Sequence, residues 1–138
     1  METTVTKINH EELSIILEVA AYHNHAIAIT IPRSQKMYVK RNREFRSDKW
    51  ADVILGGGYV YVWDMYADAD SLEDKRSERA VTFDEEDHSI AYRLDLENVL
   101  AGLSKDAGLA CKVIEGDGDA ADAYDLVQYM MFDDIIYG

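Results

Sequence analysis

The stretch from Tyr59 to Tyr66 constrains the fold more than any other part of the chain. It reads YVYVWDMY, and aromatic and β-branched residues at this density are typical of a β-strand. One strand needs partners for its backbone N–H and C=O groups, so the chain must contain a sheet. Apolar runs and turn residues predict the other strands at 26–31, which Pro32 ends, and at 37–45, 80–83, 89–94 and 109–114.

Apolar residues spaced at 3.6 positions predict helices between these strands. Asn9 and Glu12 have the spacing of a capping box before a first helix from about His10 to Tyr22. Further helices are expected at 48–55 with Ser47 as its cap, from Asp95 to about Gly108, and after the turn at 116–119. The sequence therefore predicts an α+β fold in one domain, 1–138: a mainly antiparallel sheet of four or five strands packed against three or four helices.

Composition indicates a cytoplasmic protein. No apolar run approaches the roughly 20 residues of a membrane span, and the N-terminus lacks the pattern of a signal peptide. Cys111 is the one cysteine, which excludes an internal disulfide and fits a reducing compartment. Its place in the run LACKVI predicts a small, buried side chain.

The net charge of −13 is concentrated in the second half of the chain. Residues 1–63 contain eight Lys or Arg and seven acids, whereas residues 64–138 contain six Lys or Arg and twenty acids. Such a surface keeps a protein in solution, disfavours contact with nucleic acid, and accelerates encounter with basic partners. We therefore expect no direct binding of nucleic acid or membrane.

Acidic residues along the last predicted helix are the candidate partner-binding site. Interleaved apolar residues exclude a disordered tail, and Ala123, Val127, Met130 and Met131 form the predicted buried stripe. Gln128 and Tyr129 are expected to continue the exposed acidic face. The candidates are Asp117, Asp119, Asp122 and Asp125, joined by the turn residues Asp84, Glu85, Glu86 and Asp87.

The motifs of common catalytic and metal sites do not match. An EF-hand loop that begins at Asp117 would need an oxygen ligand at position 121, glycine at position 122 and glutamate at position 128. The chain has Ala121, Asp122 and Gln128 at these positions. His23 and His25 lack further ligands at a zinc spacing. Glycines 56–58 are not followed by the Gly-Lys-Ser/Thr of a phosphate loop, and no Gly-x-Ser-x-Gly is present. We expect no cofactor, no metal and no catalytic residue.

Residues 33–49, which we call the basic segment, contain most of the cations of the first half. Tyr38, Phe45 and Trp50 lie among these cations or directly after them, as in some nucleic-acid-binding patches. Because the other half is so acidic, we expect the segment to pair with the protein's own acids, within one chain or across a dimer. Its cations are Arg33, Lys36, Lys40, Arg41, Arg43, Arg46 and Lys49.

Two stretches, 92–103 (YRLDLENVLAGL) and 126–138 (LVQYMMFDDIIYG), resemble small uncharacterised acidic proteins encoded by phages and other mobile elements. The resemblance implies a setting in a bacterial host cytoplasm and carries no catalytic residue.

In that setting we expect an inhibitor of a host defence nuclease or CRISPR complex. Neighbouring carboxylates on a helix lie about 5–6 Å apart, and would imitate DNA phosphates toward a basic nucleic-acid-binding host protein. One alternative is a small interaction or structural module, alone or as a homodimer, with Tyr59–Tyr66 in its core or interface. The other is an enzyme with an unrecognised site.

Overall fold

Four antiparallel strands and five α-helices make up the described part of the chain. The computed structural model describes residues 4–67, 79–86 and 88–137. The strands are β1 (Ile27–Thr30), β2 (Val60–Asp64), β3 (Ala80–Phe83) and β4 (Ile90–Leu94). The helices are α1 (His10–Ala21), α2 (Arg46–Leu55), α3 (Leu96–Lys105), α4 (Ala107–Ile114) and α5 (Ala120–Phe132), with a 3-10 helix η1 (Arg33–Tyr38). The predicted α+β class is confirmed, with more helices than expected.

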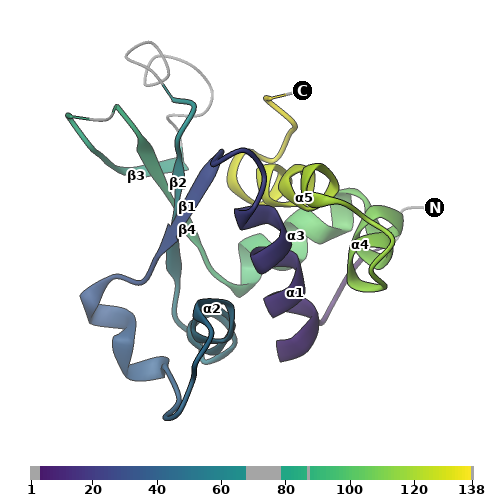
Figure 1. Ribbon diagram of the computed structural model, residues 1–138, viewed down its shortest axis with the longest axis horizontal. Helices are drawn as coiled ribbons and strands as arrows, with labels where there is room; N and C mark the ends of the chain where they lie inside the picture. The colour runs from purple at the N-terminus through teal and green to yellow at the C-terminus, as the bar shows by residue number, and fades with distance from the viewer. Residues whose placement is uncertain (1–3, 68–78, 87, 138) are drawn as a thin grey trace.

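The strand predicted most strongly from sequence is β2, one of the two central strands of the sheet. The strand order is β1-β2-β4-β3 (Figure 1). Val62 pairs with Ile29 of β1 on one side and with Tyr92 of β4 on the other. Val60 and Val62 are fully buried, whereas Tyr61 and Trp63 between and after them are half-buried. The period of two therefore separates a core face from a second, aromatic face.

The two edge strands differ. In β3 the register shifts between Ala80 and Thr82, so that Val81 is an extra residue in the ladder. Such a bulge protects an edge from pairing with another chain. The β1–β2 ladder is continuous from Ile27 to Thr30, and β1 contains no charged residue or proline.

Side-chain caps begin four of the five α-helices, all except α2. At α1 the Asn9 side chain accepts from the Glu12 N–H (2.8 Å) and the Glu12 carboxylate accepts from the Asn9 N–H (3.0 Å), which confirms the predicted capping box. Asp95 accepts from the N–H of Asn98 at α3, as predicted. Each cap satisfies an N–H that the helix itself leaves unpaired.

One hydrophobic cluster joins the sheet to the helices. Helices α1, α3 and α5 lie on one side of the sheet (Figure 1), and their buried residues belong to the same hydrophobic cluster as those of the strands. Helices α3 and α5 approach closely at Gly102, where an added Cβ would lie 2.5 Å from Met130 Cγ and 2.8 Å from Met130 N. The absence of a side chain at Gly102 is therefore a condition of this helix pairing.

The prediction of a strand at 37–45 is wrong. The chain turns into η1 after Pro32 and then forms a loop. Its polar groups are satisfied by side chains instead of a ladder: the Asp52 carboxylate accepts from the Lys40 N–H (3.0 Å). The buried Gln35 side chain accepts from the Tyr59 N–H (3.1 Å). The Asp52 contact thus gives a backbone N–H of this loop a partner, and the Gln35 contact joins η1 to the residue before β2.

The predicted strand at 109–114 is also wrong, because this run is helix α4. The Asp106 carboxylate accepts from the Leu109 N–H at 3.0 Å and starts the helix, and Gly108 lies inside it instead of ending α3. The helix buries Ala110 and Val113 but leaves Cys111 exposed, which corrects the predicted burial of that thiol.

The start of α2 differs as well. Phe45 is its cap residue, without a side-chain hydrogen bond, and Ser47 is buried in the first turn.

Candidate functional site

The connection from α4 to α5 and the first turns of α5 hold five of the protein's acids, which we call the acidic end: Glu115, Asp117, Asp119, Asp122 and Asp125. The first three side chains are exposed and the last two are half-buried. Asp119 is the cap of α5: its carboxylate accepts from the Asp122 N–H (2.9 Å), and the Asp122 carboxylate accepts from the Asp119 N–H (3.1 Å). Two of the candidate residues are therefore needed to begin the helix.

Asp122 is also neutralised in part by a cation. The N–H of Asp119 is the main reason that the pKa of Asp122 lies below its ordinary value, and the Lys112 ammonium, 3.4 Å away, lowers it further. This ion pair joins α4 to α5 across the turn. The freely displayed charge of the acidic end therefore comes mainly from Glu115, Asp117 and Asp119.

The carboxyl of Asp125 has the opposite shift. Burial raises its pKa, and the negative charges of Asp122 and Asp119 raise it further, against a lowering by His23. The His23 ring stacks on Tyr124 with centroids 5.0 Å apart, which keeps the imidazole near this position. Asp125 is thus a partly desolvated carboxyl among like charges.

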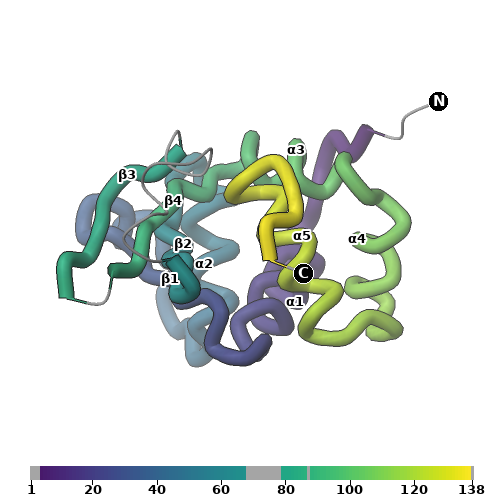
Figure 2. The backbone as a smooth tube through the Cα atoms, turned by 90° about the horizontal axis from the view of Figure 1, so that it is seen from above, coloured from purple at the N-terminus to yellow at the C-terminus, as the bar shows by residue number. Residues whose placement is uncertain are grey.

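The hairpin turn between β3 and β4 holds the other predicted site residues. Asp84, Glu85 and Glu86 belong to it, and the Asp84 carboxylate accepts from the Glu86 N–H (2.9 Å). Asp87 lies outside the described residues. In both views the hairpin and the α4–α5 connection lie at opposite ends of the molecule (Figures 1 and 2). The candidate acids therefore form two separate groups and not one surface.

The basic segment does not cover the acidic end. It forms η1, the following loop and the start of α2, away from α4 (Figures 1 and 2). Within the described ranges, no ion pair joins the two regions. The predicted pairing with the protein's own acids is seen at Arg43, whose partner Asp52 belongs to the less acidic half.

Asp52 is the buried anchor of this segment. Its carboxylate receives Arg43 Nε at 3.0 Å and Arg43 Nη2 at 2.9 Å, besides the Lys40 N–H. Burial by itself would raise the pKa of Asp52, but the Arg43 and Lys40 hydrogen bonds outweigh it and hold the pKa below its ordinary value. The same hydrogen bond raises the pKa of Arg43. The loop is thereby fastened to α2.

Gln128 is fully buried, so the prediction that it continues an exposed acidic face is wrong. Its Oε1 accepts from the N–H groups of Ile136 (2.9 Å) and Tyr137 (2.8 Å), and its Nε2 donates to the Tyr137 carbonyl (3.1 Å). Tyr137 in turn donates its hydroxyl to the buried carboxylate of Asp64 (2.7 Å). These bonds fasten the chain after α5 to the end of β2.

A polar network between α1 and α2 has residue types found in hydrolases but another arrangement. Ser14 Oγ donates to the Asp48 carboxylate at 3.4 Å, while His10 Nε2 lies 3.1 Å from Asp52. A nucleophilic serine needs the imidazole as its base. Here the hydroxyl meets a carboxylate instead, so the network holds α1 against α2. In the described part of the chain, no group of three His, Cys, Asp or Glu side chains is placed to hold a metal ion.

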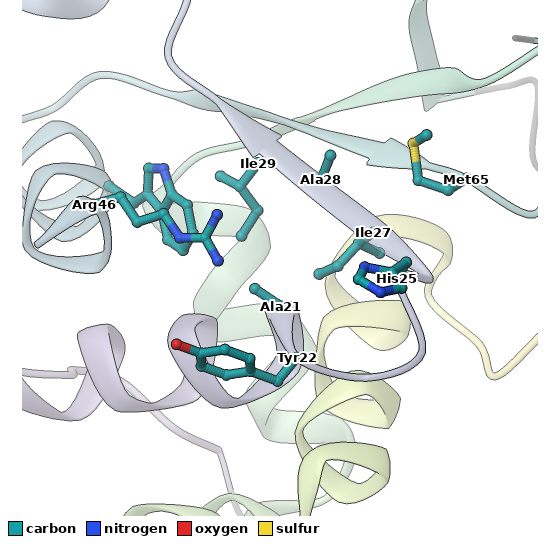
Figure 3. A pocket seen from close by; sticks show the side chains of 9 residues that line it. Ala21, Tyr22, His25, Ile27, Ala28, Ile29, Arg46 and Met65 are labelled. Carbon is teal, nitrogen blue, oxygen red and sulfur yellow. The ribbon is translucent and has the colours of Figure 1, made fainter.

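Sequence reasoning missed a groove of about 460 Å³ beside β1 (Figure 3). Ile27 and Ile29 face it from the strand, Tyr22 from the end of α1, and Arg46 with Trp50 from α2. The Arg46 guanidinium lies 5.3 Å from the Trp50 ring centroid. The sequence does show that the predicted strand 26–31 contains no charged residue. It does not show whether this strand lies at the edge of the sheet or in its centre.

Comparisons with protein-family models, curated proteins and solved structures find no match to this chain. Of the helices that the structure describes, none has both the length and the apolar character required to cross a bilayer.

Proposed function

We propose that this protein is a phage or mobile-element inhibitor of a host defence nuclease or CRISPR complex. It acts without catalysis, by inserting its acidic end into a basic groove that otherwise holds DNA. The partner is thus a cationic nucleic-acid-binding protein of the bacterial cytoplasm.

The separation of charge along the molecule carries this proposal. The acidic end lies away from the basic segment (Figure 2), so its exposed carboxylates remain available to another protein. Over residues 106–125 six acids face one lysine, whereas residues 33–49 contain seven Lys or Arg and two acids. Neutralisation of the first group by the second would have removed the basis for mimicry.

The exposed acids before α5 suit a partner that binds phosphates. Glu115, Asp117 and Asp119 alternate with glycine along the connection. Asp122 follows Asp119 at a three-residue step, about 5–6 Å between Cβ atoms on a helix, although Lys112 pairs with Asp122. Double-stranded DNA presents a negative charge about every 1.7 Å of its axis. The acidic end therefore offers a short, coarse imitation of such a row, and the hairpin turn is not part of it.

A plaque assay tests the proposal directly. Bacteria with an active CRISPR system or defence nuclease are infected with a targeted phage, with and without expression of this chain. We expect expression to restore plaque formation. The double variant Glu115→Gln/Asp117→Asn, which spares the cap of α5, should lose much of this effect.

A matched control removes the same charge elsewhere. Glu85→Gln/Glu86→Gln lies in the hairpin turn and should inhibit like the unaltered protein. Equal loss in both double variants would indicate an effect of net charge alone. No restoration of plaques in any defence system of a broad panel would refute the inhibitor proposal.

A salt series with a purified, susceptible defence complex tests the binding mode. Charge-based competition with DNA should weaken steeply from low to moderate salt, because screening shortens the reach of exposed charges to about 8 Å at physiological ionic strength. Inhibition that does not change with salt would contradict mimicry.

A second candidate function is an interaction module that forms a homodimer through the aromatic face of the sheet. Tyr59, Tyr61 and Trp63 form a ladder there, with centroid distances of 5.8 and 6.5 Å, and Arg93 lies 4.2 Å from the Tyr59 centroid. Light scattering after size-exclusion chromatography tests this candidate. A dimer that Tyr61→Thr converts to a monomer would favour it, and a monomer at high concentration would exclude it.

A further inference from the structure

The outer edge of β1 has backbone groups that the sheet itself leaves unpaired. The Met65 N–H donates to the Ala26 carbonyl at 3.0 Å. Hydrogen-bonded and non-bonded pairs alternate along an antiparallel ladder. Ala28 and Thr30 therefore direct their N–H and C=O groups toward β2, while Ile27 and Ile29 direct theirs outward. Within the described residues, the outward groups of Ile27 and Ile29 have no hydrogen-bond partner.

This edge also lacks the features that protect the other one. β3 is interrupted by its bulge at Val81, but β1 is regular and uncharged over its whole length. An exposed, regular and apolar edge is a template for a further strand. β1 is therefore the edge of this sheet with the more regular ladder; because Ile29 is half-buried and Ile27 is only 5% exposed, an added strand would reach Ile29 first.

The groove beside β1 supplies space for the side chains of such a strand. Its walls include Ile27 and Ile29 from one face of the sheet and Ala28 and Met65 from the other (Figure 3). The groove thus extends around the edge instead of lying on one face. An added strand directs alternate side chains to opposite faces, so both sets would find lining residues.

The positive charge of Arg46 at the groove favours extended peptides that contain an acidic residue. The Arg46 side chain is exposed and directed toward the space beside Ile29 (Figure 3). Its contact with Trp50 holds the guanidinium without neutralising it, and Arg46 has no ion pair with any described residue. A carboxylate arriving with a strand would find an unpaired, geometrically held cation.

We propose that the β1 edge and its groove bind an extended peptide segment of another protein that has apolar residues at alternate positions and an acidic side chain opposite Arg46. The peptide pairs with the outward backbone groups of Ile27 and Ile29. A second copy of this chain fits less well, because its own β1 would bring no carboxylate to Arg46. The proposal does not depend on the acidic end.

The test uses the full chain and short labelled peptides of alternating valine and threonine, each with one glutamate at a different position. Binding is followed by fluorescence anisotropy, and the bound site by amide NMR signals and hydrogen exchange. We expect the best peptide to shift the Ile27 and Ile29 amide signals and slow their exchange. Replacing its glutamate with glutamine should weaken binding about tenfold, as expected for loss of a charged hydrogen bond.

Two variants separate the groove from general charge. Arg46→Gln should reduce affinity for the glutamate peptide about tenfold and remove the preference over the glutamine peptide. Arg41→Gln removes an exposed cation of the same segment outside the groove and should leave the affinity unchanged. Denaturation curves confirm that both variants remain folded.

Three results would overturn the proposal. The first is the absence of saturable binding by every peptide of the set up to millimolar concentration. The second is binding whose NMR shifts map outside β1, or whose affinity Arg46→Gln does not change. The third is self-association through β1, which would assign the edge to a second copy of this chain.

Discussion

Arg43 donates two hydrogen bonds, of 2.9 and 3.0 Å, to the buried carboxylate of Asp52, and so connects the basic segment to α2. Removing the charge from Asp52 would leave Arg43 without its partner and the Lys40 N–H with a weaker acceptor. We expect Asp52→Asn to lower the free energy of unfolding by about 2–3 kcal/mol. Urea denaturation at neutral pH measures it. Asp48→Asn, at a longer and more exposed contact, should cost less than about 1 kcal/mol.

The lowered pKa of Asp52 also gives a pH dependence. Its folded value lies below the ordinary 3.8, so the unfolded chain takes up this proton first as the pH falls. The contribution of the Arg43–Asp52 pair is complete above the ordinary pKa and is lost as the pH falls through the lowered, folded value. The stability difference between the unaltered protein and Asp52→Asn should therefore shrink in acid. A difference that stays constant to low pH would contradict this.

Asp125 should behave in the opposite way. Burial and the charge of Asp122 raise its folded pKa above the ordinary 3.8, so its ionised form costs stability at neutral pH. Asp125→Asn should therefore stabilise the protein, by about 0.5 kcal/mol. The gain should decrease as the pH falls through the raised pKa and vanish below the ordinary one. Paired thermal melts at neutral and acid pH measure this, with the exposed Asp117→Asn as comparison.

Two glycine substitutions test the packing of the helices. Gly102→Ala would place its methyl group 2.5 Å from Met130 Cγ and against the α5 backbone. We expect a net loss of about 2 kcal/mol. Gly108→Ala would place its methyl group 3.7 Å from Asp106 Oδ1, an ordinary contact, and should instead gain about 0.5–1 kcal/mol from helix propensity. If both substitutions stabilise, the close approach of α3 and α5 is wrong.

The thiol of Cys111 should be reactive in the native protein. It lies on the exposed side of α4, and access together with thiolate character governs reaction rates. We expect a maleimide to label native and denatured protein at rates within about tenfold of each other, compared by mass spectrometry. Full protection of the Cys111 thiol from labelling in the native protein would instead support the buried position that the sequence predicts. Cys111→Ser serves as the unlabelled control.

Local patterns predicted the elements that depend on local causes. The caps at Asn9 and Asp95, the strand at Tyr59–Tyr66 and the β3–β4 hairpin follow from neighbouring residues and were correct. The run LACKVI at 109–114 was ambiguous, because short apolar runs suit strands and helices equally. The cap at Asp106, which starts α4, decided the outcome.

The remaining features depend on contacts between distant residues. Gln128 is buried because the segment at Tyr137 returns to it, and in the irregular segment 37–45 the Lys40 N–H pairs with Asp52 of α2 instead of with a neighbouring strand. The candidate acids were identified by composition, but only the fold separates the hairpin turn from the acidic end. The groove at β1 needed the strand order, which no local pattern contained.

The separation of the basic segment from the acidic end leaves the charge of the described residues unevenly distributed, with the cations of η1 and α2 away from the carboxylates of the α4–α5 connection (Figure 1). The field of a highly charged surface exerts a torque on such a distribution before any atoms touch. A cationic partner would therefore be turned toward the α4–α5 connection. The protein arrives aligned, and dilute electrolyte preserves that alignment over a longer approach than concentrated electrolyte does.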